Sequence, residues 1–463
     1  MKLNRNFGHT KFRTLPINIL RSFGVNRAIA FGILTRMWGS LAGPITIFLI
    51  ATRFSKVEQG YYYTFGSLLA LQIFFELGLL TVLAQFAAHE FAFLSWGEKG
   101  EITGSEAHRE RFVDLLGKGF KWYAISAMLL IPVLILVGFL FFTQTTAVDF
   151  SWRLPWALAV IGVGCNLLLI PFYAVITGSG DVASINRREM MGGMAGSIIG
   201  WLVIACGGGL YAIPAVTTGA IIVGVAYLFK SKPKLVKTAF SCAFGSRRVA
   251  HTISWRGEVW PMQWKIAISW VSGYFIFQLF TPVLFKFHGP VVAGQMGMTL
   301  SAINAVQSIC LMWLQTRSPE FGKFIASKNW KGLDESFNQL LKQAITVCII
   351  TAAVAIIVIA GLQSYTSIGT RFLPVLQVMI FLVAVCGNVV ISGWAIYMRA
   401  HKQEPMMLIS IISAILIGIS TLILGVKFSS IGMVIGYCLI TLVYGIPSTY
   451  VCLSKFKAKV QVG

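Results

Sequence analysis

The chain has 463 residues, of which 56% are hydrophobic and only 12% are charged, and its mean hydropathy is +0.77. A soluble domain carries roughly 25% charged residues, so this sequence cannot cover its surface against water. In lipid, a chain must satisfy its own backbone hydrogen bonds, and continuous apolar runs of about 20 residues favour helices over barrel strands. The composition therefore excludes a soluble protein and predicts an all-α polytopic membrane protein.

The net charge of +22 could by itself indicate a nucleic-acid-binding protein. The basic residues are instead spread in short clusters between apolar runs, as in cytoplasmic loops that face anionic headgroups. The sequence contains no GxxxxGKS or GxxxxGKT phosphate loop, no HExxH motif and no paired carboxylates within an apolar run. We therefore expect no nucleic-acid partner, no metal site, no bound cofactor, no catalytic residues and no enzymatic activity.

About twelve apolar runs follow one another along the chain. The first begins near Ala28, behind a basic N-terminal stretch, and is too long and too late for a secretory signal, so we expect it to be retained. The fifth and sixth runs are separated only by a glycine-rich turn at 206–210, which leaves eleven or thirteen as alternative counts. The predicted spans are 28–51, 61–88, 122–143, 155–177, 191–209, 211–229, 266–285, 290–314, 343–362, 373–398, 406–425 and 431–453.

Lysine and arginine alternate from loop to loop in a way that tests this count. With the N-terminus placed in the cytoplasm, 31 of the 38 basic residues fall in cytoplasmic segments, six fall in external loops, and Arg36 lies inside a span. This asymmetry predicts that both termini are cytoplasmic. The external loops hold only Arg53, Lys56, Arg153, Lys286, Arg371 and Lys427.

The sequence also indicates an internal repeat. A shift of 234 residues places Gly60 on Gly294 and Ser67 on Ser301, and equal numbers of spans lie on each side of the basic stretch 230–265. We therefore predict an N-terminal lobe over 1–229 with spans 1–6, a cytoplasmic linker over 230–265, and a C-terminal lobe over 266–463 with spans 7–12.

Two of the predicted cytoplasmic segments are amphipathic. Leu333, Phe337 and Leu340 recur at helical spacing among polar residues, and Phe112, Leu115 and their neighbours do the same more briefly. They predict helices that lie on the membrane surface or, alternatively, helical extensions of the spans that follow.

Few ionisable residues lie within the predicted spans. Arg36 lies in the first span and Glu76 near the middle of the second, where a charge costs roughly 2.5–3.5 kcal/mol unless it faces the protein interior or water. One hypothesis makes Arg36 an anion-binding residue and Glu76 a titratable ion-coupling residue in a transport path, with Gln72 one turn away. The alternative is a static ion pair between the first two helices.

The eighth span carries a polar stripe on one helical face. Ser301, Asn304, Ser308 and Gln315 recur at spacings of three, four and seven residues. Asn304 and Ser308 are candidates for a hydrophilic cavity wall. Hydrogen bonds between neighbouring helices are the alternative explanation.

Three segments resemble a known family. Residues 58–90 (EQGYYYTFGSLLALQIFFELGLLTVLAQFAAHE), 176–191 (ITGSGDVASINRREMM) and 314–326 (LQTRSPEFGKFIA) are similar to bacterial polysaccharide-biosynthesis transporters. These are the lipid-linked oligosaccharide flippases of the MATE-like superfamily, which includes the multidrug and toxin extruders. Such flippases often carry several cationic residues in a central cavity, whereas here Arg36 is the only basic residue deep in a predicted span.

The resemblance implies two six-helix lobes around a central cavity that works by alternating access. The implied substrate is an undecaprenyl-diphosphate-linked oligosaccharide, flipped from the inner to the outer leaflet of the bacterial inner membrane, with coupling to a proton or sodium gradient. Membrane lipids and other polysaccharide-assembly proteins are the expected partners. The alternatives are an ion-coupled drug/cation antiporter of the same superfamily and a membrane-embedded glycosyltransferase or polymerase.

Overall fold

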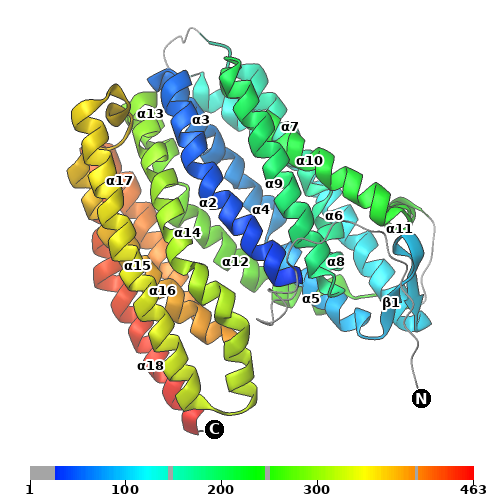
Figure 1. Cartoon of the computed structure of the whole chain (residues 1–463). Helices are drawn as coiled ribbons and strands as arrows, with labels where there is room; N and C mark the ends of the chain where they lie inside the picture. The colour runs from blue at the N-terminus through cyan, green and yellow to red at the C-terminus, as the bar shows by residue number, and fades with distance from the viewer. Residues whose placement is uncertain (1–26, 144–149, 246–250, 402–404, 463) are drawn as a thin grey trace, which may run out of the picture.

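The computed structural model describes residues 27–143, 150–245, 251–401 and 405–462. Within these ranges nearly all residues are helical, as the hydropathy predicts, and the β-structure is a single two-stranded antiparallel sheet. Figure 1 shows α15 to α18 on one side and α6 to α11 on the other, with α2 and α3 between them. The predicted basic tail before residue 27 lies outside the described residues. The chain is an all-α, multi-pass membrane protein.

The first half of the described chain contains all of the β-structure and most of the short helices. Its elements are α2 (Arg27–Arg53), α3 (Lys56–Leu69), η1 (Ala70–Gln72), α4 (Ile73–Glu76), α5 (Leu79–Phe91), β1 (Leu94–Trp96), η2 (Glu98–Gly100), β2 (Ile102–Gly104), α6 (Glu106–Phe142), α7 (Arg153–Leu167), α8 (Ile170–Gly178), α9 (Val182–Ala205), η3 (Gly209–Tyr211), α10 (Ala212–Ser231) and α11 (Pro233–Phe244).

The second half consists of longer helices. Its elements are η4 (Trp255–Val259), α12 (Trp260–Phe277), α13 (Phe280–His288), α14 (Pro290–Ala326), α15 (Trp330–Tyr365), η5 (Ser367–Arg371), α16 (Val375–Ala400), α17 (Met407–Leu439), η6 (Ile440–Gly445) and α18 (Ile446–Val462). All twelve predicted runs fall on helical segments of the two halves.

Not every predicted run is a separate long helix. Among the described residues, seven helical stretches are long and apolar enough to cross a membrane, or nine when each of two bent pairs is one span. The stretch Met407–Lys459 covers two predicted runs and reverses at Ser429, which has φ 56° and ψ −147°. A Cβ on Gly436 would lie 2.0 Å from the Ser420 hydroxyl, although these positions would be about 24 Å apart in a straight helix. The reversal is compatible with twelve crossings, which remain a prediction.

The second predicted span is bent at its centre. The helices on either side of Leu77 and Gly78 meet at 44°, and both residues have a left-handed backbone, with φ of 51° and 65°. A Cβ on Gly78 would lie 2.5 Å from Cγ2 of Ile266 in α12, so only glycine fits this approach. A similar break of 42° separates α12 from α13.

The two halves of the chain meet where α3 packs against α14. A Cβ on Gly60 would lie 2.0 Å from the Pro290 carbonyl oxygen, and one on Gly294 would lie 2.9 Å from the Gly60 nitrogen. These two glycines are the pair that the predicted repeat superimposes. Their contact is the one expected if α3 and α14 are related by a two-fold axis between the halves.

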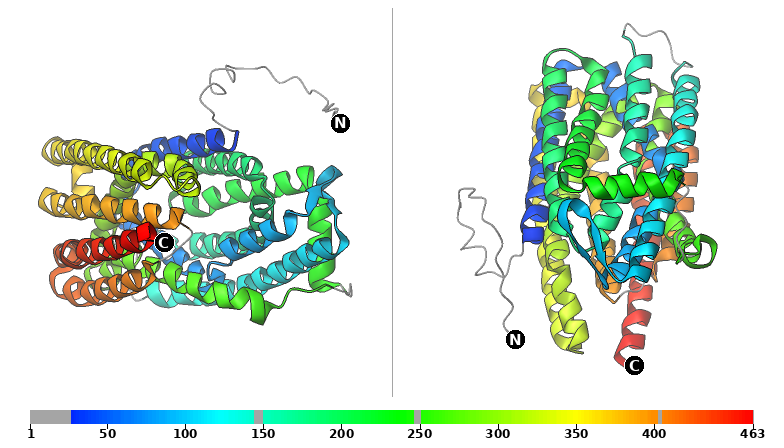
Figure 2. Two further views of the ribbon diagram at one scale, coloured as in Figure 1. Left: turned by 90° about the horizontal axis from the view of Figure 1, so that it is seen from below. Right: turned by 90° about the vertical axis from the view of Figure 1, so that its right-hand side faces the viewer.

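The two amphipathic segments are helical extensions rather than separate surface helices. Phe112 and Leu115 lie within α6, and Leu333 and Phe337 lie within α15, with these four side chains buried. The helix that lies across the others is α11, inside the predicted linker (Figure 2, right). We use "basic end" for the end of the bundle formed by α11, the β1–β2 hairpin and the end of α18. The charge asymmetry predicts that this end is cytoplasmic.

Candidate functional site

A polar cavity of about 660 Å³ lies between α2, the end of α12 and α14. We call it the polar cavity. It brings together three of the predicted site residues, Arg36, Asn304 and Ser308, which come from both halves of the chain. Its polar lining residues are Arg36, Ser40, Gln278, Ser301, Asn304, Gln307, Ser308 and Gln315.

The α2 helix has two different faces. Leu41 and Phe48 are exposed on one face, as expected of side chains that contact lipid. The other face carries Arg36, Gly39 and Gly43 to the polar cavity. No atom outside the local helix lies within 4 Å of where a Cβ on Gly39 or Gly43 would be, so the glycines leave the cavity open.

The polar stripe of α14 forms the facing wall. Asn304, Ser308 and Gln315 are exposed to the cavity, and the Ser308 hydroxyl donates to the Asn304 carbonyl of its own helix at 2.8 Å. At 1.5 Å per residue, the stripe from Ser301 to Gln315 extends about 21 Å along the helix. This length suits an elongated ligand.

Glu76 and Gln72 lie outside the polar cavity. Glu76 is only 6% exposed, at the bend of the second span, and accepts a hydrogen bond from the Tyr123 hydroxyl of α6 at 3.5 Å. Gln72 is half-buried in the tight turn η1. Among the ion pairs of the described residues, none joins Arg36 to Glu76. The structure therefore offers no support for a static pair between the first two helices.

A second cavity of about 310 Å³ adjoins the first through Phe277, Leu311 and Gln315. It extends between α16, α17 and η6, and its lining includes Asn388 and Arg399. The Asn388 amide donates to the Tyr437 hydroxyl at 2.7 Å. No sequence pattern links these residues, because they lie on different helices at unrelated spacings.

At the end opposite the basic end, hydrogen bonds close the two halves against each other. The Gln59 amide in α3 donates to the Gly294 carbonyl at 2.9 Å and to the Arg371 carbonyl at 3.0 Å. The Arg371 guanidinium donates back to the Gln59 amide oxygen at 3.1 Å and also to the Phe54 carbonyl. The polar cavity lies on the basic side of this closure.

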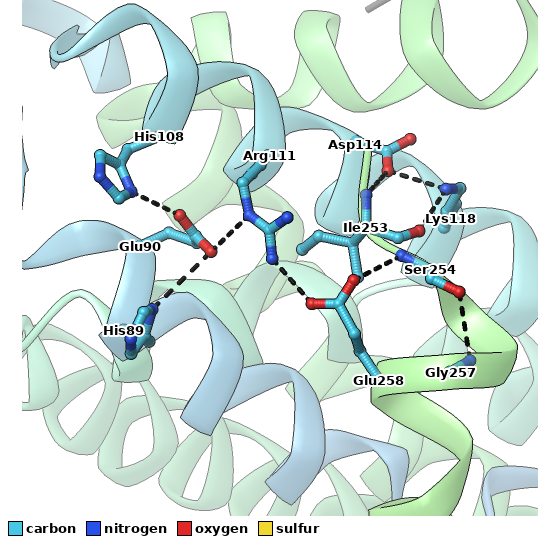
Figure 3. A network of polar contacts seen from close by, with 10 residues as sticks. All are labelled: His89, Glu90, His108, Arg111, Asp114, Lys118, Ile253, Ser254, Gly257 and Glu258. Carbon is cyan, nitrogen blue, oxygen red and sulfur yellow. Dashed lines mark hydrogen bonds and ion pairs between the residues drawn. The ribbon is translucent and has the colours of Figure 1, made fainter. Parts of the chain in front are cut away.

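A buried carboxylate organises the contacts at the basic end (Figure 3). Glu90, 2% exposed at the end of α5, lies 2.7 Å from His108 Nδ1 and accepts from Arg111 Nε at 2.9 Å. Burial opposes its ionisation, but the hydrogen bonds from Arg111 and His108 outweigh it, so the pKa of Glu90 lies below its ordinary value. Glu90 follows the predicted run 61–88, so we expect it to lie outside the membrane-spanning part. Arg111 also donates to Glu258 at 2.8 Å, which joins α6 to η4.

The same face of α6 fixes the chain just before α12. Asp114 accepts from the Ile253 backbone N–H at 2.7 Å, and the Lys118 ammonium donates to the Ile253 carbonyl at 2.7 Å (Figure 3). Glu258 accepts from the Ser254 N–H at 2.8 Å. Residues 253–258 are therefore fastened to the N-terminal half, although the predicted linker contains them.

The chain is a multi-pass membrane protein, and its fold is shared by solved structures of MATE-like, MOP-superfamily transporters. The chain is similar in structure to the lipid II flippase MurJ in an inward closed conformation, with a TM-score of 0.57 and 14% identity over 94% of this chain and 90% of that one. It is also similar to a mutant of the Vibrio cholerae MATE transporter VcmN, with a TM-score of 0.55 and 12% identity over 94% and 100%. A MATE-family multidrug resistance transporter in an inward-facing conformation gives a TM-score of 0.51 and 13% identity over 90% and 99%. No protein-family model matches the sequence, and no curated protein matches it.

Proposed function

We propose that the chain is a membrane transporter that flips an undecaprenyl-diphosphate-linked oligosaccharide from the inner to the outer leaflet. The composition of the polar cavity carries the proposal: it holds Arg36 among amides and hydroxyls, and none of its described lining residues has a carboxylate. A guanidinium with no acidic neighbour in the cavity suits a diphosphate, while amides and hydroxyls suit sugar hydroxyls. The antiporter alternative is less favoured, because a cationic drug would meet Arg36 and no acidic partner there.

The way in which the two halves meet supports transport by alternating access. Gln59, Gly294 and Arg371 close them at one end, and the polar cavity lies between them on the basic side of that closure. With the basic end cytoplasmic, the described state would receive its cargo from the inner leaflet. Transport would then require the Gln59–Arg371 contacts to open and the basic end to close.

Glu76 is the candidate for ion coupling. It is a buried carboxyl group at the bend of the second span, and its described partner is a hydroxyl, that of Tyr123. Ionisable residues at this depth are expensive to keep charged and commonly mark proton or ion pathways. A proton or sodium ion bound at Glu76 would act on the bend at Leu77 and Gly78, which packs against α12 of the other half.

The proposal places the protein in the bacterial inner membrane with both termini in the cytoplasm. Its product would be a lipid-linked sugar in the outer leaflet, ready for surface polysaccharide assembly. The proteins that add and polymerise the sugars are the partners this role requires. The prenyl tail would remain in lipid while the diphosphate and sugar occupy the polar cavity.

A cavity-filling substitution tests the proposal. Gly43→Leu would place a side chain in the polar cavity where no atom outside the local helix lies within 4 Å of the new Cβ. We expect it to abolish delivery of a diphosphate-linked prenyl sugar to the outer leaflet of proteoliposomes while leaving the melting temperature unchanged or higher, because leucine favours a helix over glycine by up to about 1 kcal/mol. Gly361→Leu in α15, also in open space but away from the cavity, is the matched control.

Substitutions of Arg36 distinguish a lipid-linked oligosaccharide flippase from a drug/cation antiporter. Arg36→Met should remove transport of the diphosphate-linked substrate, and Arg36→Lys should retain part of it, since the charge is kept but not the planar fork. Cationic dye export that survives Arg36→Met, with no movement of the lipid-linked sugar by the unaltered protein, would establish an antiporter instead.

A further inference from the structure

The α11 helix packs against the N-terminal half at the basic end, although it lies within the predicted linker. Leu235 and Ala239 are buried against the N-terminal half, and Cys242 packs so close to Gly117 of α6 that a Cβ there would lie 2.8 Å from its own. Just before the helix, the buried Lys232 ammonium lies 3.7 Å over the Trp96 ring and 3.7 Å from Asp181. The β1–β2 hairpin therefore holds the start of α11 in place.

One exposed edge of α11 is aromatic. Phe240 and Phe244 are 51% and 66% exposed, and their rings lie 4.7 Å and 6.1 Å from that of Phe120 in α6. The predicted membrane run of α6 begins at residue 122. This aromatic edge therefore lies at the level where the apolar part of the membrane starts.

The exposed face of α11 next to these aromatic residues is basic. Lys234, Lys237 and Ser241 form, with Arg109 of α6, much of the wall of a pocket of about 320 Å³. Arg109 is about 16 Å from Phe120 along α6, on the side away from the membrane centre. An amphipathic helix with aromatic residues toward the acyl chains and lysines toward the headgroups is the arrangement of an interfacial helix.

The charges of this pocket leave a positive excess. Its one described carboxylate, Glu101, pairs with Lys234, whose hydrogen bond and charge hold the pKa of Glu101 below its ordinary value. Arg109 lies 3.6 Å from Glu106 on its own helix. Lys237 has no carboxylate partner among the described ion pairs.

We propose that this pocket binds the phosphate of an anionic membrane lipid, with Lys237 and Arg109 on the phosphate and Phe240 and Phe244 among the acyl chains. The site is distinct from the polar cavity between the halves, and its occupant is a resident lipid rather than the transported one. A bound lipid would fix α11, and with it the start of the connection between the two halves, to the membrane surface.

The test uses the full-length protein in nanodiscs of phosphatidylcholine with increasing phosphatidylglycerol, with retained lipid counted by native mass spectrometry. Lys237→Gln should weaken retention of one phosphatidylglycerol about fivefold, since a lysine near an anionic surface contributes about that factor. Glu101→Gln removes the competing carboxylate and should strengthen it. Lys455→Gln, an exposed lysine of α18 at the same end, is the matched control and should change little.

Melting temperatures in pure phosphatidylcholine show whether each variant is folded, and they should agree within error. Equal retention by Lys237→Gln and Lys455→Gln would overturn the proposal. Inorganic phosphate and glycerol phosphate form the second arm. If either protects the unaltered protein from unfolding as strongly as phosphatidylglycerol does, the pocket is a site for a soluble anion and the lipid assignment is wrong.

Discussion

Replacing Gly60 by alanine tests whether the α3–α14 contact holds the described state closed. The added Cβ would lie 2.0 Å from the Pro290 carbonyl oxygen, whereas ordinary contacts begin near 3.4 Å, so the two helices must separate by more than 1 Å. Overpacking of this kind costs about 1–3 kcal/mol, and here the cost falls only on states in which the halves touch at this end. The equilibrium should shift toward the open state by about 5–150-fold.

Gly66→Ala on the same helix is the matched control, because a Cβ there meets no atom within 4 Å. Both substitutions gain the same helix propensity, so their difference isolates the contact with α14. Spin labels at the exposed positions Lys56 and Ser367, in a background without native cysteines, would report the opening as a longer distance population in double electron–electron resonance. If the distance distributions of the Gly60→Ala and Gly66→Ala proteins coincide, this contact does not control closure.

Three further results are expected. Glu90→Gln should destabilise the protein by about 1–3 kcal/mol at pH 7. Because the pKa of Glu90 is lowered in the folded protein, the carboxylate stabilises the fold above the unfolded pKa near 4.3, and this contribution disappears as the pH falls through the folded pKa. The difference in melting temperature between the two proteins should therefore shrink below about pH 4, and a pH-independent difference would contradict this. A cysteine at Lys56 should react with an impermeant thiol reagent in intact cells and one at Ser105 should not; the reverse pattern would invert the orientation. Arg36→Met and Glu76→Gln share no described contact, so their effects on unfolding free energy should add within about 0.5 kcal/mol, and stronger coupling would indicate a pair.

Hydropathy and charge predicted the helices and their order because every segment that spans lipid must be apolar and must satisfy its own backbone hydrogen bonds. The bend at Leu77 and Gly78 could not be predicted in the same way, because a single charge at Glu76 and a glycine at position 78 are both compatible with a straight span in the hydropathy pattern. Gln72 and Glu76 both precede this break, at the end of η1 and at the end of α4.

Some of the residues that line the polar cavity were predicted from the sequence. Asn304 and Ser308 followed from periodicity within one helix, and Arg36 from its depth in the first span, and the structure places all three together. Gln278 ends α12 at a helix break and lines the cavity, and no periodic pattern in the sequence indicates this position. Contacts between helices that are distant in sequence leave no periodic signal.

The fastening of residues 253–258 to α6 has a mechanical consequence. Only Val259 separates Glu258 from the start of α12, so the chain that connects the two halves cannot extend at this point. Sliding the halves apart there would break the contacts of Arg111 and Asp114, whereas a rotation can be absorbed further along, at the break between α12 and α13. Gln278 lies at that break and in the wall of the polar cavity. A bound substrate would then contact the hinge between α12 and α13, so substrate binding and rotation of the two halves would be directly coupled.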